Sequence, residues 1–564
     1  MNAFDYAVLV GTMVGIAVYG IWKTRHLSDL SSFLRGSGTN RWMGIGVSVM
    51  ATQASAITFL STPGQGYQNG LGFVQNYFGA PFALIVISVV FLPMYRRLRV
   101  HTVYEFLGQR FDAKTRLLGA SLFLLQRGLS AGITIYAPAI VLSTVLGFPL
   151  SVTIVACSAL VIAYTVSGGC DAVSVTQKYQ MGIIFVGMVS AFGLLVSKLP
   201  ADLGFVDALA LAGGFQKLKA VNFSVDLQER YTFWSGLLGG LFLALSYFGA
   251  DQSQVQRYVG GASLRDSRLG LMFNAVCKIP MQFGILLLGV LLSVFYQFHT
   301  PPVFFNTVAW QQQVDGGAGD ELHALEEQFV AAHGGTRDEL RTWLAARHAG
   351  DQAAEARALE AARSAQVRAE AVRTQTRDSL HRRAPKLATN DADYVFITFV
   401  LNQLPHGLIG LLLAAFFAAA FQSNAAELNA LASTTTIDLY RHVFRSGHDD
   451  THHFVASKWW TAFWGLVAMS FALFASMSEN LIQAVNIVGS IFYGVVLGLV
   501  LSAFFFKTVR GTAVFWGALA AQALVFILFS ALNISYLWYN VIGCAACVLF
   551  GLALQTVLDL RHGS

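Results

Sequence analysis

The sequence predicts an all-α polytopic membrane protein with about thirteen transmembrane helices. Of the 564 residues, 55% are hydrophobic and only 12% are charged, whereas a soluble domain has about 25% charged residues. The apolar residues form repeated runs of roughly 20 residues, the length with which an α-helix crosses a bilayer. These runs lack the period-two alternation of a membrane β-barrel. We therefore expect the lipid bilayer as a partner, and the basic loops give no reason to expect nucleic acid binding.

The apolar runs define the expected spans. The first run has no basic segment before it, so we interpret it as a spanning helix rather than a cleaved signal peptide. Cys544 and Cys547 have the spacing of a redox or metal motif, but inside an apolar helix we interpret them as packing residues. The expected spans are residues 5–23, 43–68, 73–95, 115–146, 150–167, 173–197, 232–252, 268–298, 407–436, 456–475, 482–506, 512–533 and 535–558.

Basic residues gather in alternate connections, and cytoplasmic loops are the basic ones in membrane proteins. This pattern predicts an external N-terminus, a cytoplasmic C-terminus and a bacterial-type inner (plasma) membrane. The residues are Lys23, Arg25, Arg35, Arg41, Arg96, Arg97, Arg99, Arg110, Lys114, Arg116, Arg257, Arg265, Arg268, Arg441, His442, Arg445, Lys507 and Arg510.

A polar insertion at residues 300–392 separates two parts of the membrane domain, residues 1–299 and 393–564. It is rich in Glu, Arg, Ala and Leu, which predicts two or three amphipathic helices on the extracellular or periplasmic face. Gly334–Gly335 and Gly350 are the expected interruptions. We interpret the insertion as a structural cap; binding of a partner protein is the alternative.

Two spans carry residues that interrupt a helix. The second has small and β-branched residues over 51–58, followed by Pro63, and the seventh has Gly249 and Asp251 near its end. Irregular backbone at membrane depth is tolerated only where it lines a site. Interrupted helices five spans apart are typical of secondary transporters built from inverted repeats.

Six local strings, in order along the chain, resemble the sodium/solute symporter family, which includes sodium/glucose, iodide, multivitamin and sialic acid symporters. YFGADQSQVQRY at 247–258 is the most specific. The others are SSFLRGSGTNRWMGIGVSVMATQASA, HTVYEFLGQRF, IYAPAIVL, YTVSGGCDAVSVTQ and STTTIDLY. The resemblance implies a leucine-transporter-type 5+5 inverted-repeat core in spans two to eleven.

The resemblance also implies a sodium site between the broken second span and the ninth. Its ligands would be the carbonyl oxygens of Ala51, Ala54 and Ala419 and the side chains of Gln422 and Ser423. Oxygen ligands suit a hard cation, and carbonyls released by helix unwinding supply them. Gln422 stands where the family usually has Ser or Thr. For Ser423 the alternative is a hydrogen bond back to its own helix.

Some members of the family have a second sodium site, which needs hydroxyls and an Asp. The corresponding positions here are Ala425, Ala426 and Gln177, followed by Lys178. We predict that this second site is missing, and hence a stoichiometry of one sodium per solute.

Arg127 lies about eleven residues into span four, close to the membrane midplane. It either recognises an anionic group of the solute or forms a salt bridge. Asp251 is expected in the inner gate, and Glu427 in helix packing. By resemblance, the other expected solute contacts are Gln53, Ser55, Thr58, Phe59, Gln75 and the gating aromatic Tyr247.

These features predict sodium-coupled symport of a small organic solute, with a carboxylate-bearing solute such as sialic acid or a monocarboxylate as the best match. Sodium is the expected coupling ion, with no organic cofactor, and the chain is expected to be a monomer. No phosphate-binding loop or catalytic constellation is present, so we do not expect an enzyme. The alternatives are a sodium-independent or proton-coupled transporter and a transporter-like solute sensor.

Overall fold

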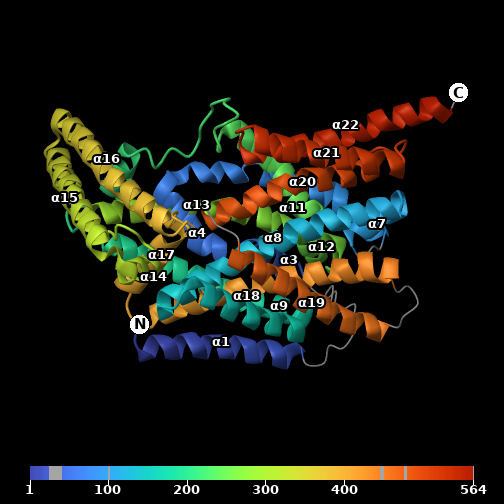
Figure 1. Cartoon of the computed structure of the whole chain (residues 1–564), viewed down its shortest axis with the longest axis horizontal. Helices are drawn as coiled ribbons and strands as arrows, with labels where there is room; N and C mark the ends of the chain where they lie inside the picture. Colours follow the sequence, from blue (N-terminus) through green and yellow to red (C-terminus); the bar gives the residue numbers. More distant parts are fainter. Residues whose placement is uncertain (25–40, 99–101, 386, 445–449, 475–478, 563–564) are drawn as a thin grey trace.

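The computed structural model describes residues 1–24, 41–98, 102–385, 387–444, 450–474 and 479–562. Within these residues the chain folds into helices and contains no β-strand. Figure 1 shows most helices side by side along one direction, with α15 and α16 extending beyond one end of the bundle. We call this end the insertion face. The N-terminus lies at this end in Figure 1, and the C-terminus lies at the other.

Every expected span contains helix. Eight stretches of the described chain are long and apolar enough, by length and composition, to cross a membrane. In chain order the helices are α1 (Ala3–Thr24), α3 (Trp42–Gln53), α4 (Ala56–Asn69), η1 (Gly70–Tyr77), α5 (Ala80–Val86), η2 (Ile87–Phe91), α6 (Leu92–Leu98), α7 (Val103–Arg110), α8 (Ala113–Leu146), α9 (Leu150–Ser197), α10 (Phe205–Gly214), η3 (Ser235–Gly239), α11 (Gly240–Gly249), α12 (Gln252–Val259), α13 (Leu264–Phe298), α14 (Thr307–Gln313), η4 (Val314–Ala318), α15 (Gly319–Ala349), α16 (Gln352–Arg383), α17 (Ala392–Gln403), α18 (Leu408–Thr434), η5 (Thr435–Phe444), α19 (Asp450–Phe474), α20 (Leu481–Phe505), α21 (Gly511–Ala531) and α22 (Tyr536–His562).

Both predicted helix interruptions are present. In the second span, α3 ends at Gln53, and Ser55 has extended backbone (φ −73°, ψ 176°) before α4 begins. In the seventh span, α11 ends at Gly249 and α12 begins at Gln252. The prediction of two interrupted helices in corresponding places is confirmed.

Three other spans differ from the expectation. The third is divided into η1, α5, η2 and α6 rather than forming one regular helix. Residues 150–167 and 173–197, expected as two spans, belong to one helical element, α9. The two ends of α9 have different neighbours: the Thr153 hydroxyl donates to Ala139 O of α8, whereas Gly187 faces Leu412 of α18.

Glycines allow the interrupted span to pack closely on its neighbours. A Cβ atom on Gly289 of α13 would lie 2.0 Å from the carbonyl oxygen of Pro63 in α4, and one on Gly64 would lie 2.1 Å from the Ala392 carbonyl oxygen of α17. Real Cβ atoms do not approach oxygen so closely, so only glycine fits at these contacts. Helix α4 is thereby held between α13 and α17.

The insertion contains α14, η4 and a long hairpin of α15 and α16. Gly350 ends α15 in the left-handed conformation (φ 73°), as is common for glycine at a helix C-terminus. The expectation that Gly334 and Gly335 interrupt the helix is wrong, because α15 continues through both. Glycine costs a helix about 1 kcal/mol relative to alanine, and packing against α16 offsets that cost.

Several expectations fall outside the described residues. They concern Arg25, Arg35, Arg99 and Arg445 in basic connections, the side chains of Gln177 and Lys178, and part of the first family string. Ala425 and Ala426 are buried in α18. Cys544 and Cys547 are buried in α22, where a Cβ atom on Gly498 of α20 would lie 2.6 Å from the Cys547 Cβ.

Candidate functional site

A cavity of about 100 Å³ lies at the two helix interruptions, enough for several water molecules. Residues from α3 and α4 form one wall, and residues from α11 form another. Helices α8, α18 and α20, together with η1 and α5, complete it. The lining residues are Thr52, Gln53, Ser55, Ile57, Thr58, Asn76, Tyr77, Ala80, Arg127, Thr134, Gly240, Leu243, Ala244, Tyr247, Phe248, Glu427, Ile482, Val485, Asn486 and Tyr493.

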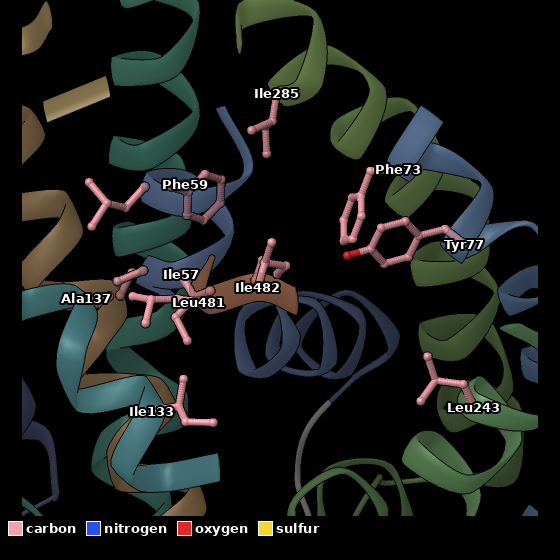
Figure 2. Packing of buried hydrophobic residues seen from close by; sticks show 14 of the residues in the cluster. Ile57, Phe59, Phe73, Tyr77, Ile133, Ala137, Leu243, Ile285, Leu481 and Ile482 are labelled. Atoms are coloured by element: carbon pink, nitrogen blue, oxygen red, sulfur yellow. The ribbon is translucent and has the colours of Figure 1, made fainter. Parts of the chain in front are cut away.

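Apolar side chains surround part of this cavity. Figure 2 shows Ile57 and Ile482 on one side and Tyr77 on the other, with the Tyr77 hydroxyl oxygen pointing toward Ile482. All three residues line the cavity and are at least nine-tenths buried. Apolar side chains around a few polar groups are typical of small-molecule sites.

The polar part of the cavity is a buried ion cluster, which we call the Arg127 cluster: Arg127, Asp251, Glu427 and Tyr493. Arg127 Nη1 lies 3.1 Å from Glu427 Oε1, while Nη2 pairs with Asp251 Oδ2 and lies 2.8 Å from the Tyr493 hydroxyl. The guanidinium also lies over the Tyr247 ring, 5.5 Å from its centroid. In this conformation Arg127 therefore forms salt bridges, which was one of the two roles expected for it. A single cation faces two carboxylates.

Asp251 has two roles in the cluster. Its Oδ1 atom accepts from the Ser253 backbone N–H at 2.9 Å and caps α12, while Oδ2 accepts from Arg127 and from the Tyr493 hydroxyl at 3.0 Å. A carboxylate at a helix N-terminus is favoured by the N–H groups that it satisfies there. Asp251 thus faces the cavity cation, in addition to ending the seventh span as expected.

Tyrosine hydroxyls satisfy the carbonyl groups that the seventh span exposes at its interruption. Tyr258, Tyr95 and Tyr104 donate to the carbonyl oxygens of Phe248 (2.8 Å), Gly249 (2.7 Å) and Ala250 (3.0 Å). Buried carbonyls without a partner are costly, especially in a membrane. Three separate helices therefore fix the end of α11 in place.

The structure brings five of the predicted solute contacts to the cavity wall: Gln53, Ser55, Thr58, Arg127 and Tyr247. The Gln53 Oε1 atom is buried without a hydrogen-bond partner, and the Tyr247 hydroxyl accepts from Gln254 Nε2 at 2.7 Å.

Two predicted contacts lie elsewhere in this conformation. The Gln75 amide bonds to Tyr231 O at 3.0 Å and accepts from the Asn222 N–H at 2.9 Å, so it holds η1 against the connection before η3. Its neighbour Asn76 lines the cavity instead. Phe59 is buried in the apolar packing beside the cavity.

The predicted sodium ligands are all buried, where α3 and α4 pack against α18. No N–H group in the described part of the chain donates to the carbonyl oxygen of Ala51 or Ala54. The Gln422 Nε2 atom is buried without a partner, and the Ser423 hydroxyl donates to Ala420 O at 3.2 Å. The Ala51 and Ala54 carbonyls and the Ser423 hydroxyl, which donates backwards, therefore keep lone pairs available for a hard cation such as sodium.

Comparison with known proteins decides the family. The profile described as "Sodium:solute symporter family" matches residues 33–315 and 379–521, which is most of the chain. The chain belongs to the sodium:solute symporter family. The symporters of this family and the structural neighbours are transporters, not enzymes.

Individual relatives agree with this assignment. The chain is 33% identical over 276 residues to the human sodium-coupled monocarboxylate transporter 1, an alignment that spans 48% of this chain and 45% of the relative. It is 30% identical over 302 residues to the human sodium/iodide cotransporter, spanning 52% and 46%. The chain thus matches about half the length of these relatives. The sodium/sialic acid symporter SiaT of Proteus mirabilis is 24% identical over 97% of this chain and 94% of that protein.

Solved structures show the fold. A Na⁺-coupled sialic acid symporter in a substrate-bound, outward-open state matches with a TM-score of 0.74 and 22% identity, over 99% of this chain and 98% of that one. Mhp1, a nucleobase-cation-symport-1 family transporter in a closed conformation, matches with a TM-score of 0.52 and 13% identity, over 95% and 96%. The expected leucine-transporter-type fold is confirmed.

Toward the insertion face, a buried hydrogen-bond network lies beside the cavity. We call Ser61, Asp393 and Asn480 the latch. The Ser61 hydroxyl bonds to Asp393 Oδ1 and lies 2.7 Å from Asn480 Oδ1, and Asn480 Nδ2 donates to Asp393 Oδ1 at 2.7 Å. Asp393 Oδ2 also accepts from the Leu481 N–H at 3.2 Å. The latch joins α4, α17 and α20 directly beside the apolar cavity residues Ile57 and Ile482.

Sequence reasoning did not anticipate the latch, the tyrosine caps or the role of Tyr493. Tyr493 lies in an apolar span without local motif, and Asp393 lies at the edge of the polar insertion. The sequence signal that could have indicated these contacts is a carboxylate in an apolar stretch, because such a group requires partners. Those partners come from distant parts of the chain, which spacing alone does not identify.

Proposed function

We propose that the protein carries out sodium-coupled symport of a small, carboxylate-bearing organic solute by alternating access. Family membership supports sodium coupling, and the cavity at two interrupted helices supports a solute site at mid-membrane. The single observation that carries the proposal is the position of the unpartnered Ala51 and Ala54 carbonyls opposite α18, within one helix turn of the cavity residue Gln53.

We place sodium between the Ala51, Ala54 and Ala419 carbonyls and the side chains of Gln422 and Ser423. Ser423 and Glu427 are four residues apart on α18, so their Cβ atoms lie about 5–6 Å from each other on one face. For a sodium–carboxylate separation of the same order, about 6 Å, and an effective dielectric constant of about 20, the attraction is about 3 kcal/mol. Sodium therefore competes with Arg127 for Glu427.

This competition gives a route from sodium binding to solute binding. Asp251 is held by its cap on α12, whereas Glu427 has no corresponding backbone bond, so Glu427 is the partner that leaves Arg127. The released guanidinium N–H groups then donate hydrogen bonds to the solute carboxylate. The planar guanidinium group matches the geometry of a carboxylate. A coupling of about 3 kcal/mol lies within the usual range for linked sites.

The closed latch and the small cavity support an insertion-face-closed conformation. For transport, the latch opens to admit solute and sodium, and closes before release at the opposite face. We place the insertion face outside the cell and the basic connections in the cytoplasm, with the protein in the plasma membrane as a monomer. One sodium carried with one carboxylate anion moves no net charge, so the sodium concentration gradient, rather than the membrane potential, drives uptake.

Uptake into proteoliposomes tests the proposal. The purified protein is reconstituted and offered labelled N-acetylneuraminate or lactate in sodium buffer, and sodium is replaced by choline in parallel. We expect uptake of at least one acid in sodium and its loss in choline. Equal uptake in both buffers would exclude sodium coupling, and no uptake of either acid would exclude these two classes of solute.

A further inference from the structure

A second cavity, of about 460 Å³, lies between the α15–α16 hairpin and the insertion-face ends of α4 and α13. We call it the hairpin cavity. Residues 316–378, which form α15 and most of α16, lie outside the family match. The hairpin cavity is therefore built partly from a segment that the family profile does not include. Its lining residues are Tyr67, Gln68, Asn69, Lys217, Ser293, Tyr296, Gln297, Pro301, Phe329, His333, Thr336, Gln366, Ala369, Glu370, Arg373 and Arg377.

The charges of the hairpin cavity leave one positive charge in excess. Lys217, Arg373 and Arg377 are cationic, and the carboxylates that pair with them are Glu370 and Asp391. Arg377 Nη1 lies 3.3 Å from Glu370 Oε1, and Nη2 lies 2.9 Å from Asp391 Oδ1. The Arg377 Nε atom is buried and has no partner. A ligand with a single negative charge would balance the excess positive charge of the cavity.

Two buried polar side-chain atoms, His333 Nδ1 and the Thr336 hydroxyl oxygen, also lack partners there. His333, 6% exposed, has its Nε2 atom 2.8 Å from the carbonyl oxygen of Tyr296. A carbonyl can only accept, so Nε2 carries the hydrogen, and Nδ1, which has no partner, is left as an acceptor when the ring is neutral. The Thr336 hydroxyl, on a residue 1% exposed, also has no partner.

Burial keeps His333 neutral near pH 7, because it lowers the pKa of the imidazole, and Arg373 and Arg337 lower it further. His333 therefore needs a donor from a ligand, while Arg377 Nε needs an acceptor. The rings of Phe329 and His333 lie 5.9 Å apart, and Arg373 lies 4.8 Å from the Phe329 centroid, so these groups face one space. An isolated chloride ion supplies no donor, and a simple sugar supplies no charge.

We propose that the hairpin cavity is a second binding site, distinct from the mid-membrane cavity, and that its ligand is a hydroxyl-bearing carboxylate such as a sugar acid. The carboxylate faces Arg377 and Lys217, and ligand hydroxyls bond to His333 Nδ1 and to the Thr336 hydroxyl. Tyr67 and Tyr296 provide flat walls for the carbon skeleton. The site does not depend on which solute crosses the membrane.

Hydrogen–deuterium exchange of the full-length protein in detergent locates the ligand. The probe is gluconate, which has both groups; hexanoate has only the carboxylate, and glucose has only hydroxyls. We expect gluconate to slow exchange in residues 329–377, with at least tenfold weaker effects of the other two compounds. Thr336→Val and Arg377→Gln should weaken the gluconate effect at least tenfold.

Matched variants on the same two helices serve as controls. Thr342→Val and Arg368→Gln change exposed residues of α15 and α16 and should leave the gluconate effect unchanged. Protection confined to residues near Arg127 and Tyr247 would overturn the second site while leaving the proposed transport intact. Equal protection by hexanoate, or no loss in Thr336→Val and Arg377→Gln, would also overturn it. Conversely, protection of the hairpin in a protein that fails the uptake experiment would leave the second site standing without the proposed transport.

Discussion

Arg127 Nη1 lies 3.1 Å from Glu427 Oε1, although the two residues are 300 positions apart in the sequence. Both are buried at the cavity between the two helix interruptions, one on α8 and the other on α18. A buried arginine requires counter-charges, and removing one partner of such a pair costs about 3–5 kcal/mol. The contact therefore links the helix that carries the cation to the helix that carries the proposed sodium ligands.

Glu427→Gln should reduce the dependence of solute binding on sodium. The amide keeps the shape of Glu427 but releases Arg127 without help from sodium. The proposed coupling of about 3 kcal/mol corresponds to roughly a 100-fold effect of sodium on solute affinity, and we expect the variant to retain less than a fivefold effect. Binding of the transported acid is measured by isothermal titration in sodium and in choline.

Asp251→Asn is the matched comparison. It changes the other carboxylate that pairs with Arg127, but it also weakens the cap of α12, so we expect loss of thermal stability in addition to altered binding. An unchanged sodium effect in Glu427→Gln would show that Glu427 does not transmit sodium binding.

Ser423→Ala should weaken sodium binding without unfolding the protein. It removes one of five proposed oxygen ligands and a hydrogen bond that stays within α18. We expect the sodium concentration for half-maximal uptake to rise about tenfold, equivalent to about 1.4 kcal/mol. Ser433→Ala, another buried serine of α18, is the control and should behave like the unmodified protein. Equal sodium dependence in both variants would argue against Ser423 as a ligand.

Asp393→Asn should favour opening of the insertion face. Burial raises the pKa of Asp393 to about 7, so above that pH the change removes the charge from the latch. Hydrogen bonds to a carboxylate contribute about 1.5–3 kcal/mol, compared with about 1 kcal/mol for neutral ones. We expect roughly tenfold faster modification of a cysteine introduced at Asn486, in the cavity wall, by a membrane-impermeant thiol reagent. Asp338→Asn, on the exposed side of α15, provides the control. Unchanged modification in Asp393→Asn would mean that the latch does not restrict access.

Tyr104→Phe should destabilise the interrupted seventh span. The substitution removes the hydroxyl that donates to Ala250 O at 3.0 Å and leaves a buried carbonyl without that partner, at a cost of about 1–3 kcal/mol. We expect a lower midpoint of thermal unfolding in detergent. Tyr6→Phe changes a tyrosine that is 38% exposed and should leave the midpoint unchanged. A midpoint equal to that of the unmodified protein would argue against the tyrosine caps.

Gluconate binding at the hairpin cavity should weaken as the pH rises through 8. Burial lowers the pKa of Lys217 to about 8, and the nearby Glu370 carboxylate partly offsets this effect. Below that pH the ammonium group is charged and attracts the carboxylate; above it the charge is lost, while Arg373 and Arg377 remain charged and His333 stays neutral. The affinity for gluconate should fall severalfold from pH 6.5 to pH 9.5. The Lys217→Met variant should lose this pH dependence.

The sequence was sufficient for those parts of the fold that depend on local composition. Apolar runs gave the spans, and the Gly249–Asp251 stretch marked one interruption, because both signals lie within a single segment. The prediction at Gly334 and Gly335 was wrong because a helix-breaking propensity of about 1 kcal/mol per glycine was outweighed by contacts with α16, which spacing in the sequence does not reveal.

The site was predicted less completely for the same reason. Gln53, Ser55, Thr58, Arg127 and Tyr247 share the cavity wall, but the family resemblance rather than periodicity brought them together. Gln75 and Asn76 are adjacent and chemically alike, and only tertiary contacts decide which amide bonds to Tyr231 and which lines the cavity. The partners of Arg127 come from the N-cap of α12, from α18 and from α20, and no local pattern relates those helices to α8.

The α15–α16 hairpin also has a practical consequence. Transporters of this size are difficult to align in electron cryomicroscopy, because a detergent micelle hides most of their features. Here a rigid pair of helices extends past one end of the bundle (Figure 1), so each particle carries its own orientation marker, and an antibody fragment raised against that hairpin would enlarge it without touching the transport machinery.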